Sequence, residues 1–320
     1  MSEILYAILH MTLFPGGLFA LTLGLFYKAL DRRVEARLQR RVGPPLTQPW
    51  LDIAKLCTKE TLIPRTACKS VFLAAPVVGF AGMAVCAAFI PVPGVFGGLY
   101  DMGDLLVLFY LLPIPAIAMM LGGSASSSPF GAVGFSREML LMLAYEMPLL
   151  MILLAVAMMI GSQTGGTAEF SLLRIIDWQL AEGSLGFHPA MMPALAAYLI
   201  FLPGTMGVVP FDIPEAETEI IEGPLLEYGG PLLALYQMGG ALKTFVVLGL
   251  GVALFFPGLI SEHWPLNLLW FLAKCLGLML VSLTLVKSAT GRFRIDQAFR
   301  FYVTVPTALA LCSLLLVWAL

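Results

Sequence analysis

Long uninterrupted runs of apolar residues are the feature that most restricts how this chain can fold. Hydrophobic residues make up 59% of the 320 residues and charged residues only 12%. The mean hydropathy of +0.92 lies far above the range of water-soluble domains. Inside a bilayer only a helix or a closed barrel satisfies its own backbone. Because the runs are continuous and do not alternate between polar and apolar residues, helices of about 20 residues are favoured over barrel strands. The sequence therefore predicts an all-α integral membrane protein.

We place about eight transmembrane helices along the chain and no soluble domain, so residues 1–320 are expected to form a single transmembrane domain. The first run lacks the basic start and the small-residue cleavage site of a signal peptide, and we expect it to be retained as a span. The approximate spans are 4–28, 70–92, 103–121, 137–161, 189–209, 231–256, 265–287 and 301–319.

The positive charges predict the orientation of these spans. Of the 18 Lys and Arg residues, 15 fall in the connections after the first, third and seventh spans. The connections on the opposite side contain only Arg174. Since cationic loops stay in the cytoplasm, both termini are predicted outside. We expect a multi-pass protein of the inner (cytoplasmic) membrane of a prokaryote.

Composition also narrows the ligands that the chain can hold. A net charge of −2 argues against a nucleic-acid partner. The five cysteines show no CxxC pair, and the three histidines are scattered along the sequence. We therefore predict no metal, cluster or haem bound by this chain.

The segment PFDIPEAETEIIEGPLLEYGG (residues 210–230), between the fifth and sixth spans, gathers six carboxylates and no cation. Pro214 suits a first helical position, and Gly223-Pro224 is a stop signal. A helix between them would place Glu215, Glu219 and Glu222 on one face. The sequence thus predicts a short acidic helix whose crowded carboxylates repel one another and share protons. The alternative is a solvated acidic loop that docks on a basic partner. The six acids are Asp212, Glu215, Glu217, Glu219, Glu222 and Glu227.

Five further ionisable residues lie within predicted spans, where charge is unfavourable unless it is paired or hydrated. We interpret them as parts of a proton or ion pathway. The alternatives are that Glu138 pairs with Arg137 at the membrane interface, and that the lysines neutralise buried acids structurally. The five residues are Asp104, Glu138, Glu146, Lys243 and Lys274.

The first connection contains the segment QPWLDIAKLCTKE (residues 48–60), which predicts a cytoplasmic amphipathic helix lying at the membrane surface. Anchoring to anionic lipid explains its lysines without any further role. The neighbouring arginines Arg37, Arg40 and Arg41 are candidates for docking of soluble subunits.

Four segments occur in an order and spacing that resemble a known family. They are ARLQRRVGPP with QPWLDIAKLCTKE, AYE, PFDIPEAETEIIEGPLLEY and GRFRIDQAFRF. Together they resemble the subunit 1 family of respiratory complex I, the H-type membrane subunit of NADH-quinone oxidoreductases, over essentially the whole chain. SSSPFGAVGFSREML, EGPLLEY and Lys243 resemble the membrane subunit of energy-converting [NiFe] hydrogenases of the Ech and formate hydrogenlyase type.

The resemblance implies a non-catalytic subunit of an oxidoreductase complex that couples electron transfer, from a ferredoxin-type donor to protons, to proton or sodium translocation. The [NiFe] centre and [4Fe–4S] clusters would belong to partners: the hydrogenase large and small subunits and a ferredoxin-like iron–sulfur subunit. An antiporter-like membrane subunit would complete the set. By resemblance, the six acids, Glu146 and Lys274 match the ion pathway, and Arg292, Arg294 and Asp296 match a basic cytoplasmic motif for docking.

Three other functions are compatible with the same sequence. The chain could be the quinone-chamber subunit of a complex I-like oxidoreductase. It could be a self-sufficient secondary transporter, although the paired broken spans of such proteins are not visible here. It could also be a structural anchor with an inert acidic loop.

Overall fold

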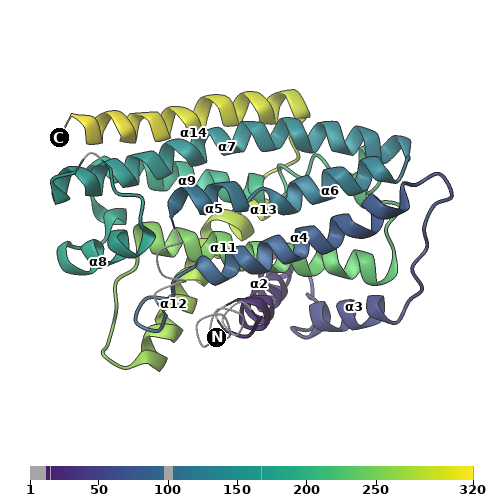
Figure 1. Cartoon of the computed structure of the whole chain (residues 1–320), viewed down its shortest axis with the longest axis horizontal. Helices are drawn as coiled ribbons and strands as arrows, with labels where there is room; N and C mark the ends of the chain where they lie inside the picture. The colour runs from purple at the N-terminus through teal and green to yellow at the C-terminus, as the bar shows by residue number, and fades with distance from the viewer. Residues whose placement is uncertain (1–11, 15, 97–103, 167, 320) are drawn as a thin grey trace.

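The apolar runs form helices that lie side by side, as Figure 1 shows for this computed structural model, which describes residues 12–14, 16–96, 104–166 and 168–319. Within these ranges the chain is all-helical, with no β-strand beyond two isolated bridges. The helices are α2 (Gly17–Leu38), α3 (Gln48–Cys57), α4 (Lys69–Phe89), α5 (Leu105–Leu111), α6 (Ile114–Ala125), α7 (Pro129–Thr164), α8 (Leu172–Glu182), α9 (Met192–Thr205), α10 (Glu217–Ile220), α11 (Gly230–Phe255), α12 (Trp264–Met279), α13 (Leu285–Ala289) and α14 (Ile295–Trp318).

Six predicted spans are helices long and apolar enough to cross a membrane. They are formed by α4, α5 with α6, α7, α11, α12 with α13, and α14. The predicted span 189–209 is a shorter apolar helix, Pro189–Thr205. The predicted span 4–28 begins outside the described residues, and α2 continues ten residues past its predicted end, to Leu38. The total of eight spans and the outside position of both termini therefore stay predictions.

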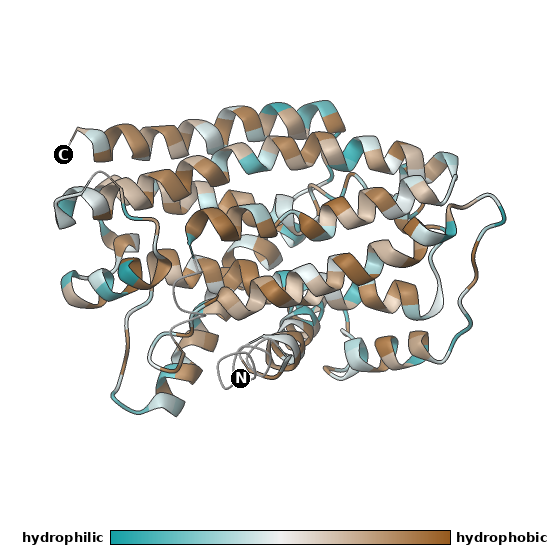
Figure 2. Ribbon diagram, viewed as in Figure 1, coloured by the Kyte–Doolittle hydropathy of each residue, from teal (hydrophilic) through white to brown (hydrophobic). Residues whose placement is uncertain are grey.

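Helix α11 is the centre of the bundle, and most of its side chains are buried. It packs against α2 and α4, while α14 packs along α7 and α9. Figure 2 shows apolar residues along α4, α6, α7 and α14, and many of them, such as Val77, Leu143 and Leu315, are exposed, as expected of helices that face lipid.

The contact between α2 and α11 depends on a glycine. A Cβ added at Gly24 would lie only 1.9 Å from the backbone oxygen of Ala241, so any side chain at position 24 would force the two helices apart. Small residues that allow such close approach are typical of helix contacts in membranes.

Five tyrosines connect the helices by donating hydrogen bonds to backbone carbonyl oxygens of other segments. Tyr228 donates to the Phe72 oxygen at 3.0 Å, a carbonyl without its usual partner because Pro76, four residues later, has no N–H. Polar bonds of this kind hold helices together where lipid tails compete for apolar contact. The other four bonds are Tyr27 to Leu272, Tyr198 to Val247, Tyr236 to Ala118 and Tyr302 to Ile200.

Two of the spans are interrupted. The third breaks between α5 and α6 at Leu112 and Pro113. The seventh contains the π-helical turn η4 (Leu280–Thr284) between α12 and α13. Departures from regular helix at membrane depth occur where they border a cavity or a functional site.

Two connections contain helices outside the spans. The predicted amphipathic helix of the first connection is α3. The connection before α9, which the sequence left without assigned structure, forms α8, with Leu172, Ile175 and Ile176 buried.

The α2–α11 contact gives a stability prediction. Gly24→Ala is expected to destabilise the folded chain by about 2 kcal/mol or more, because the new methyl group meets backbone and not a flexible side chain. Gly277→Ala in α12 is the matched control, since no atom of the described residues lies within 4 Å of a Cβ there. Thermal unfolding of the purified protein in detergent measures both, and equal melting temperatures would contradict the close approach described here.

Candidate functional site

A cavity of about 390 Å³ lies inside the bundle, where α2, α6, α7 and α11 meet the connection that follows α9. Ionisable side chains from five parts of the chain line it, so we name it the ionisable chamber. Apolar residues, among them Met119, Val208 and Met279, form the rest of its wall. The ionisable residues other than tyrosine are Lys28, Asp31, Arg32, Glu138, Glu215, Lys243 and Lys287.

Helix packing brings the two deepest lysines into the chamber. The tight contact at Gly24 holds α2 against α11, and one helical turn later Lys28 lies over Gly240. Its Nζ is 2.8 Å from the place a Cβ at Gly240 would take, so a side chain there would displace the ammonium. Lys243 follows Gly240 by three residues and therefore lies close to the same face of α11.

Glu138 of α7 and Lys243 of α11 are both buried, each with 7% of its surface exposed. Lys243 lies within electrostatic reach of Glu138, Glu146 and Glu215. In the described part of the chain, neither Glu138 nor Lys243 has a hydrogen-bond or ion-pair partner among the side chains. A buried charge without a direct partner requires water. Both residues border the chamber, which is large enough to hold several water molecules.

Glu215 brings the acidic segment to the chamber. Its side chain keeps accessible surface because it borders the cavity, although protein surrounds the carboxyl. Burial raises the pKa of the Glu215 carboxyl above its ordinary value of 4.5, and the nearby Lys28 ammonium opposes that rise. The Lys243 ammonium acts in the same direction as that of Lys28, so Glu215 joins both lysines electrostatically to the acidic segment.

The structure corrects the predicted acidic helix. Helix α10 is a single turn, Glu217–Ile220, and Ala216 before it is extended, so Glu215 is not part of any helix. Ile221 ends the turn with a φ of 63°. Glu215, Glu219 and Glu222 therefore do not form one ridge. The apolar residues Ile213, Ala216 and Ile220 of the segment are buried, and we infer that their burial decides the local conformation.

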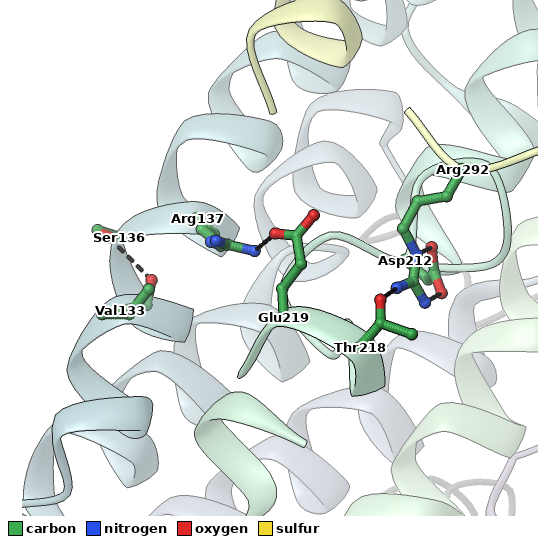
Figure 3. A network of polar contacts seen from close by, with 7 residues as sticks. All are labelled: Val133, Ser136, Arg137, Asp212, Thr218, Glu219 and Arg292. Atoms are coloured by element: carbon green, nitrogen blue, oxygen red, sulfur yellow. Dashed lines mark hydrogen bonds and ion pairs between the residues drawn. The ribbon is translucent and has the colours of Figure 1, made fainter. Parts of the chain in front are cut away.

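Two arginines compensate part of the acidic segment, which has no cation of its own (Figure 3). Arg292, from the connection before α14, binds both carboxylate oxygens of Asp212, with Nε at 2.9 Å from Oδ1. Its Nη1 also donates to Thr218 Oγ1 at 2.6 Å. Arg137 of α7 pairs with Glu219. The two pairs join residues that are 80 and 82 positions apart in the sequence, and they hold the acidic segment against the bundle.

A second charged cluster lies at the edge of the chamber. Lys287 of α13 pairs with Glu35 at 2.7 Å and with Asp31 at 3.7 Å, both on α2. Thr284 Oγ1, in the π-helical turn, donates to Asp31 Oδ1 at 2.7 Å. From the sequence, Lys28 and Lys287 were interpreted only as positive charges that set the orientation of the spans. Lys28 follows the apolar run GLFY directly, and this position at the end of a span was the available signal that it faces the interior.

Three buried polar atoms mark a path from the chamber toward Glu146. Glu146 Oε1 has no hydrogen-bond partner within the described residues, and the hydroxyl groups of Tyr145 and Thr205 lie close enough to interact with each other. All three residues border one small space beside the break at Leu112 and Pro113. Thr205 lines both this space and the ionisable chamber. It therefore connects the two.

Several predicted site residues lie elsewhere. Lys274 donates to the Phe256 oxygen at 2.7 Å and to the Gly258 oxygen, just past the end of α11. Its ammonium also lies 5.4 Å from the centre of the Trp270 ring. Cations suit helix C-termini, so this lysine stabilises the α11–α12 connection. Asp104 is exposed at the start of α5, bridged to Ser171.

The remaining candidates are on the surface or partly described. Glu222 and Glu227 are exposed and do not line the chamber. For Glu217 only the backbone position at the start of α10 is described. The docking candidates Arg37, Arg40, Arg41, Arg294 and Asp296 are exposed, whereas Arg292 turns inward to Asp212. Across the described ranges no group of three or more His, Cys, Asp or Glu residues is arranged to hold a metal ion.

Comparison with known proteins identifies the family. Residues 9–318 match the family model described as NADH dehydrogenase. Hydrogenase-4 component C of Escherichia coli (strain K12) is 35% identical over 232 residues, which cover 72% of this chain and 70% of that protein. The H subunit of NADH-quinone oxidoreductase from Syntrophotalea carbinolica is 31% identical over 313 residues, 90% and 89% of the two chains.

A solved structure agrees with these matches. One chain in the structure of the membrane-bound sulfane sulfur reductase, an archaeal respiratory membrane complex, superposes with a TM-score of 0.88 at 28% identity. The superposition covers 99% of this chain and 100% of that one. Because sequence and structure both match almost from end to end, this chain belongs to the NADH dehydrogenase family, as do membrane subunits of quinone oxidoreductases and of hydrogenases.

Proposed function

We propose that this chain is the membrane subunit of an energy-converting [NiFe] hydrogenase, and that it couples electron transfer in soluble partners to proton or sodium translocation. The observation that carries the proposal is the ionisable chamber, in which carboxylates and lysines from α2, α7, α11 and the acidic segment share one buried space. Support for the hydrogenase branch comes from two Escherichia coli relatives, hydrogenase-4 component C and formate hydrogenlyase subunit 4, each 35% identical to this chain.

The chamber suits coupling because its charges are few, close and nearly balanced. Four cations and three carboxyl groups line it, so one additional charge nearby changes which groups hold protons. Moving one elementary charge against 100 mV requires about 2.3 kcal/mol. Interactions between charges a few ångströms apart at an effective dielectric near 20 are of similar size, about 3 to 4 kcal/mol. An electron-transfer event close to the acidic segment can therefore bias proton or ion transfer through the chamber.

We infer a route through named groups. Glu215 at the acidic segment exchanges protons with the chamber, where Lys243 and Glu138 hold charge at depth. The hydroxyl groups of Thr205 and Tyr145 then continue toward Glu146. The exposed arginines Arg37, Arg40, Arg41 and Arg294 would bind the soluble hydrogenase and iron–sulfur subunits. Lys274 is placed outside this route.

A second function, the quinone-chamber subunit of a complex I-like oxidoreductase, is favoured by the size of the chamber. Its 390 Å³ falls within the range of about 300 to 1,000 Å³ typical of small-molecule sites. H subunits of NADH-quinone oxidoreductases are also among the relatives, at 28 to 31% identity.

Purification of the intact complex through a tag on this chain distinguishes the two functions. We expect nickel to copurify in a near-stoichiometric amount and the complex to evolve H2 with an artificial low-potential donor. Metal analysis and gas chromatography measure the two. A complex with flavin, no nickel and quinone reductase activity would replace the hydrogenase assignment with the second function.

Glu215→Gln is expected to lower ion uptake by liposomes containing the complex about tenfold, because the amide cannot exchange a proton. H2 evolution with the artificial donor should change little. Glu227→Gln is the matched control, since Glu227 belongs to the same segment but does not line the chamber. Equal losses in both variants would contradict a special role for Glu215 and favour the acidic segment acting as a whole.

Thr205→Val tests the connection between the chamber and Glu146. We expect ion uptake per H2 to fall about five- to tenfold, the effect of losing the contact between the Thr205 and Tyr145 hydroxyl groups at about 1 to 1.5 kcal/mol. Thr205→Ser keeps the hydroxyl group and should retain most of the uptake. If serine were as harmful as valine, the hydroxyl would have no part in transfer and the position would matter only for packing.

A further inference from the structure

A second cavity, of about 450 Å³, lies between α4 and α6 and does not border the ionisable chamber. Its walls are almost wholly apolar and include Val71, Ala74 and Val78 of α4 with Ile114, Ile117 and Leu121 of α6. Val71, Val78, Ile117 and Leu121 each expose between 38% and 56% of their surface. We name this cavity the α4–α6 groove. It is open toward the outside of the bundle.

Small residues close the bottom of the groove. Ala75 and Ala118 are buried, and a Cβ added at Gly79 would lie 2.9 Å from the Ala118 Cβ. The two helices therefore meet tightly beneath the groove, which leaves a narrow channel along the surface. From Ser70 to Val78 the channel follows about 12 Å of helix.

One end of the groove is positively charged. Ser70 is its only polar lining residue, and Lys69 precedes it at the start of α4. Arg65 lies four residues before Lys69 in the sequence, and the side chains of Arg65, Lys69 and Ser70 are all exposed. Lys69 and Arg65 take part in no ion pair within the described ranges. The segment from Arg65 to Ser70 adjoins the end of α6, since Cys68 N donates to the Ala125 oxygen and Ser127 Oγ to the Thr66 oxygen. Two exposed cations in the segment where an apolar channel ends are complementary to a phosphate that bears an acyl chain.

We propose that the α4–α6 groove binds one anionic phospholipid, with an acyl chain along the apolar channel and the phosphate at Arg65 and Lys69. A partner helix is a poorer match, because a spanning helix needs about 30 Å of contact and the groove follows less than half of that. A flexible unbranched chain fits the narrow channel between two helices that already touch.

The headgroup must supply the selectivity. Bilayer lipids are as apolar as the groove, so an acyl chain gains little by entering it. Each cation near a phosphate changes affinity by about fivefold. Zwitterionic lipids of the same chain length should consequently bind more weakly than anionic ones.

The test uses the intact complex, exchanged into nanodiscs of phosphatidylglycerol or phosphatidylcholine and then released from them for native mass spectrometry. We expect one retained phosphatidylglycerol per complex that the combined Arg65→Gln and Lys69→Gln variant loses, with retention about 20-fold weaker. Lys55→Gln, an exposed lysine away from the groove, is the matched control and should retain the lipid.

A second variant probes the channel itself. Ala74→Phe fills the groove and should reduce retention of both lipids, whereas Leu73→Phe on the adjacent exposed position should not. Retention of phosphatidylcholine equal to that of phosphatidylglycerol would overturn the proposal. Unchanged lipid retention in both the charge variant and Ala74→Phe would also overturn it. A third contradicting result would be that a partner subunit protects the Val78→Cys variant from reaction with a maleimide in the lipid-free complex, because the groove would then be covered by protein.

Discussion

Charge inside an apolar bundle is the constraint on which the rest of this structure depends. A single buried lysine or glutamate in a membrane helix is strongly unfavourable, and a direct ion pair would fix it in one state. Here Glu138 and Lys243 instead share a chamber with Lys28 and Glu215, close enough to interact but without a direct bond in the described chain. The arrangement lowers the penalty for each charge and keeps its proton exchangeable. The surrounding helices leave the cavity that this arrangement of charges needs.

The backbone irregularities of the bundle are located around that space. The π-helical turn places Leu283 on the chamber wall and Thr284 on Asp31. The break at Leu112 and Pro113 opens the small space beside Glu146. Away from the chamber, a tyrosine hydroxyl satisfies the carbonyl that Pro76 leaves without a donor. Tyr145 differs from the five tyrosines that bind carbonyl oxygens, because its hydroxyl group faces the Thr205 hydroxyl group instead. Regular helix thus holds the bundle together, and irregular helix is concentrated where polar groups must stay free.

The sequence predicted the all-helical fold and six of its spans because apolar length alone decides them. It singled out Glu138, Glu146 and Lys243 as candidates because charge within an apolar run is conspicuous. It could not predict which charges meet. Arg292 and Asp212 are 80 residues apart, and their pairing depends on how α14 returns beside the acidic segment. Lys28 was missed because its environment is set by the contact at Gly24, which only the packing of α2 on α11 reveals. The prediction of an acidic helix was wrong. Two arginines and three buried apolar residues anchor this segment, and these contacts determine its conformation more strongly than its local helical pattern does.

These anchors bear directly on how coupling would operate. Arg292 and Arg137 neutralise Asp212 and Glu219, so the acids that remain to respond to a nearby electron are those without such a partner. Of these, Glu215 is the one that lines the chamber, and burial raises the pKa of its carboxyl group above the ordinary value. A proton on Glu215 weakens its attraction for Lys28 and Lys243, which strengthens the hold of Lys243 on Glu138 and Glu146. The two arginine pairs therefore hold the acidic segment in place, and under the proposed function Glu215 is the carboxyl group of that segment through which a charge change outside the membrane would reach the chamber.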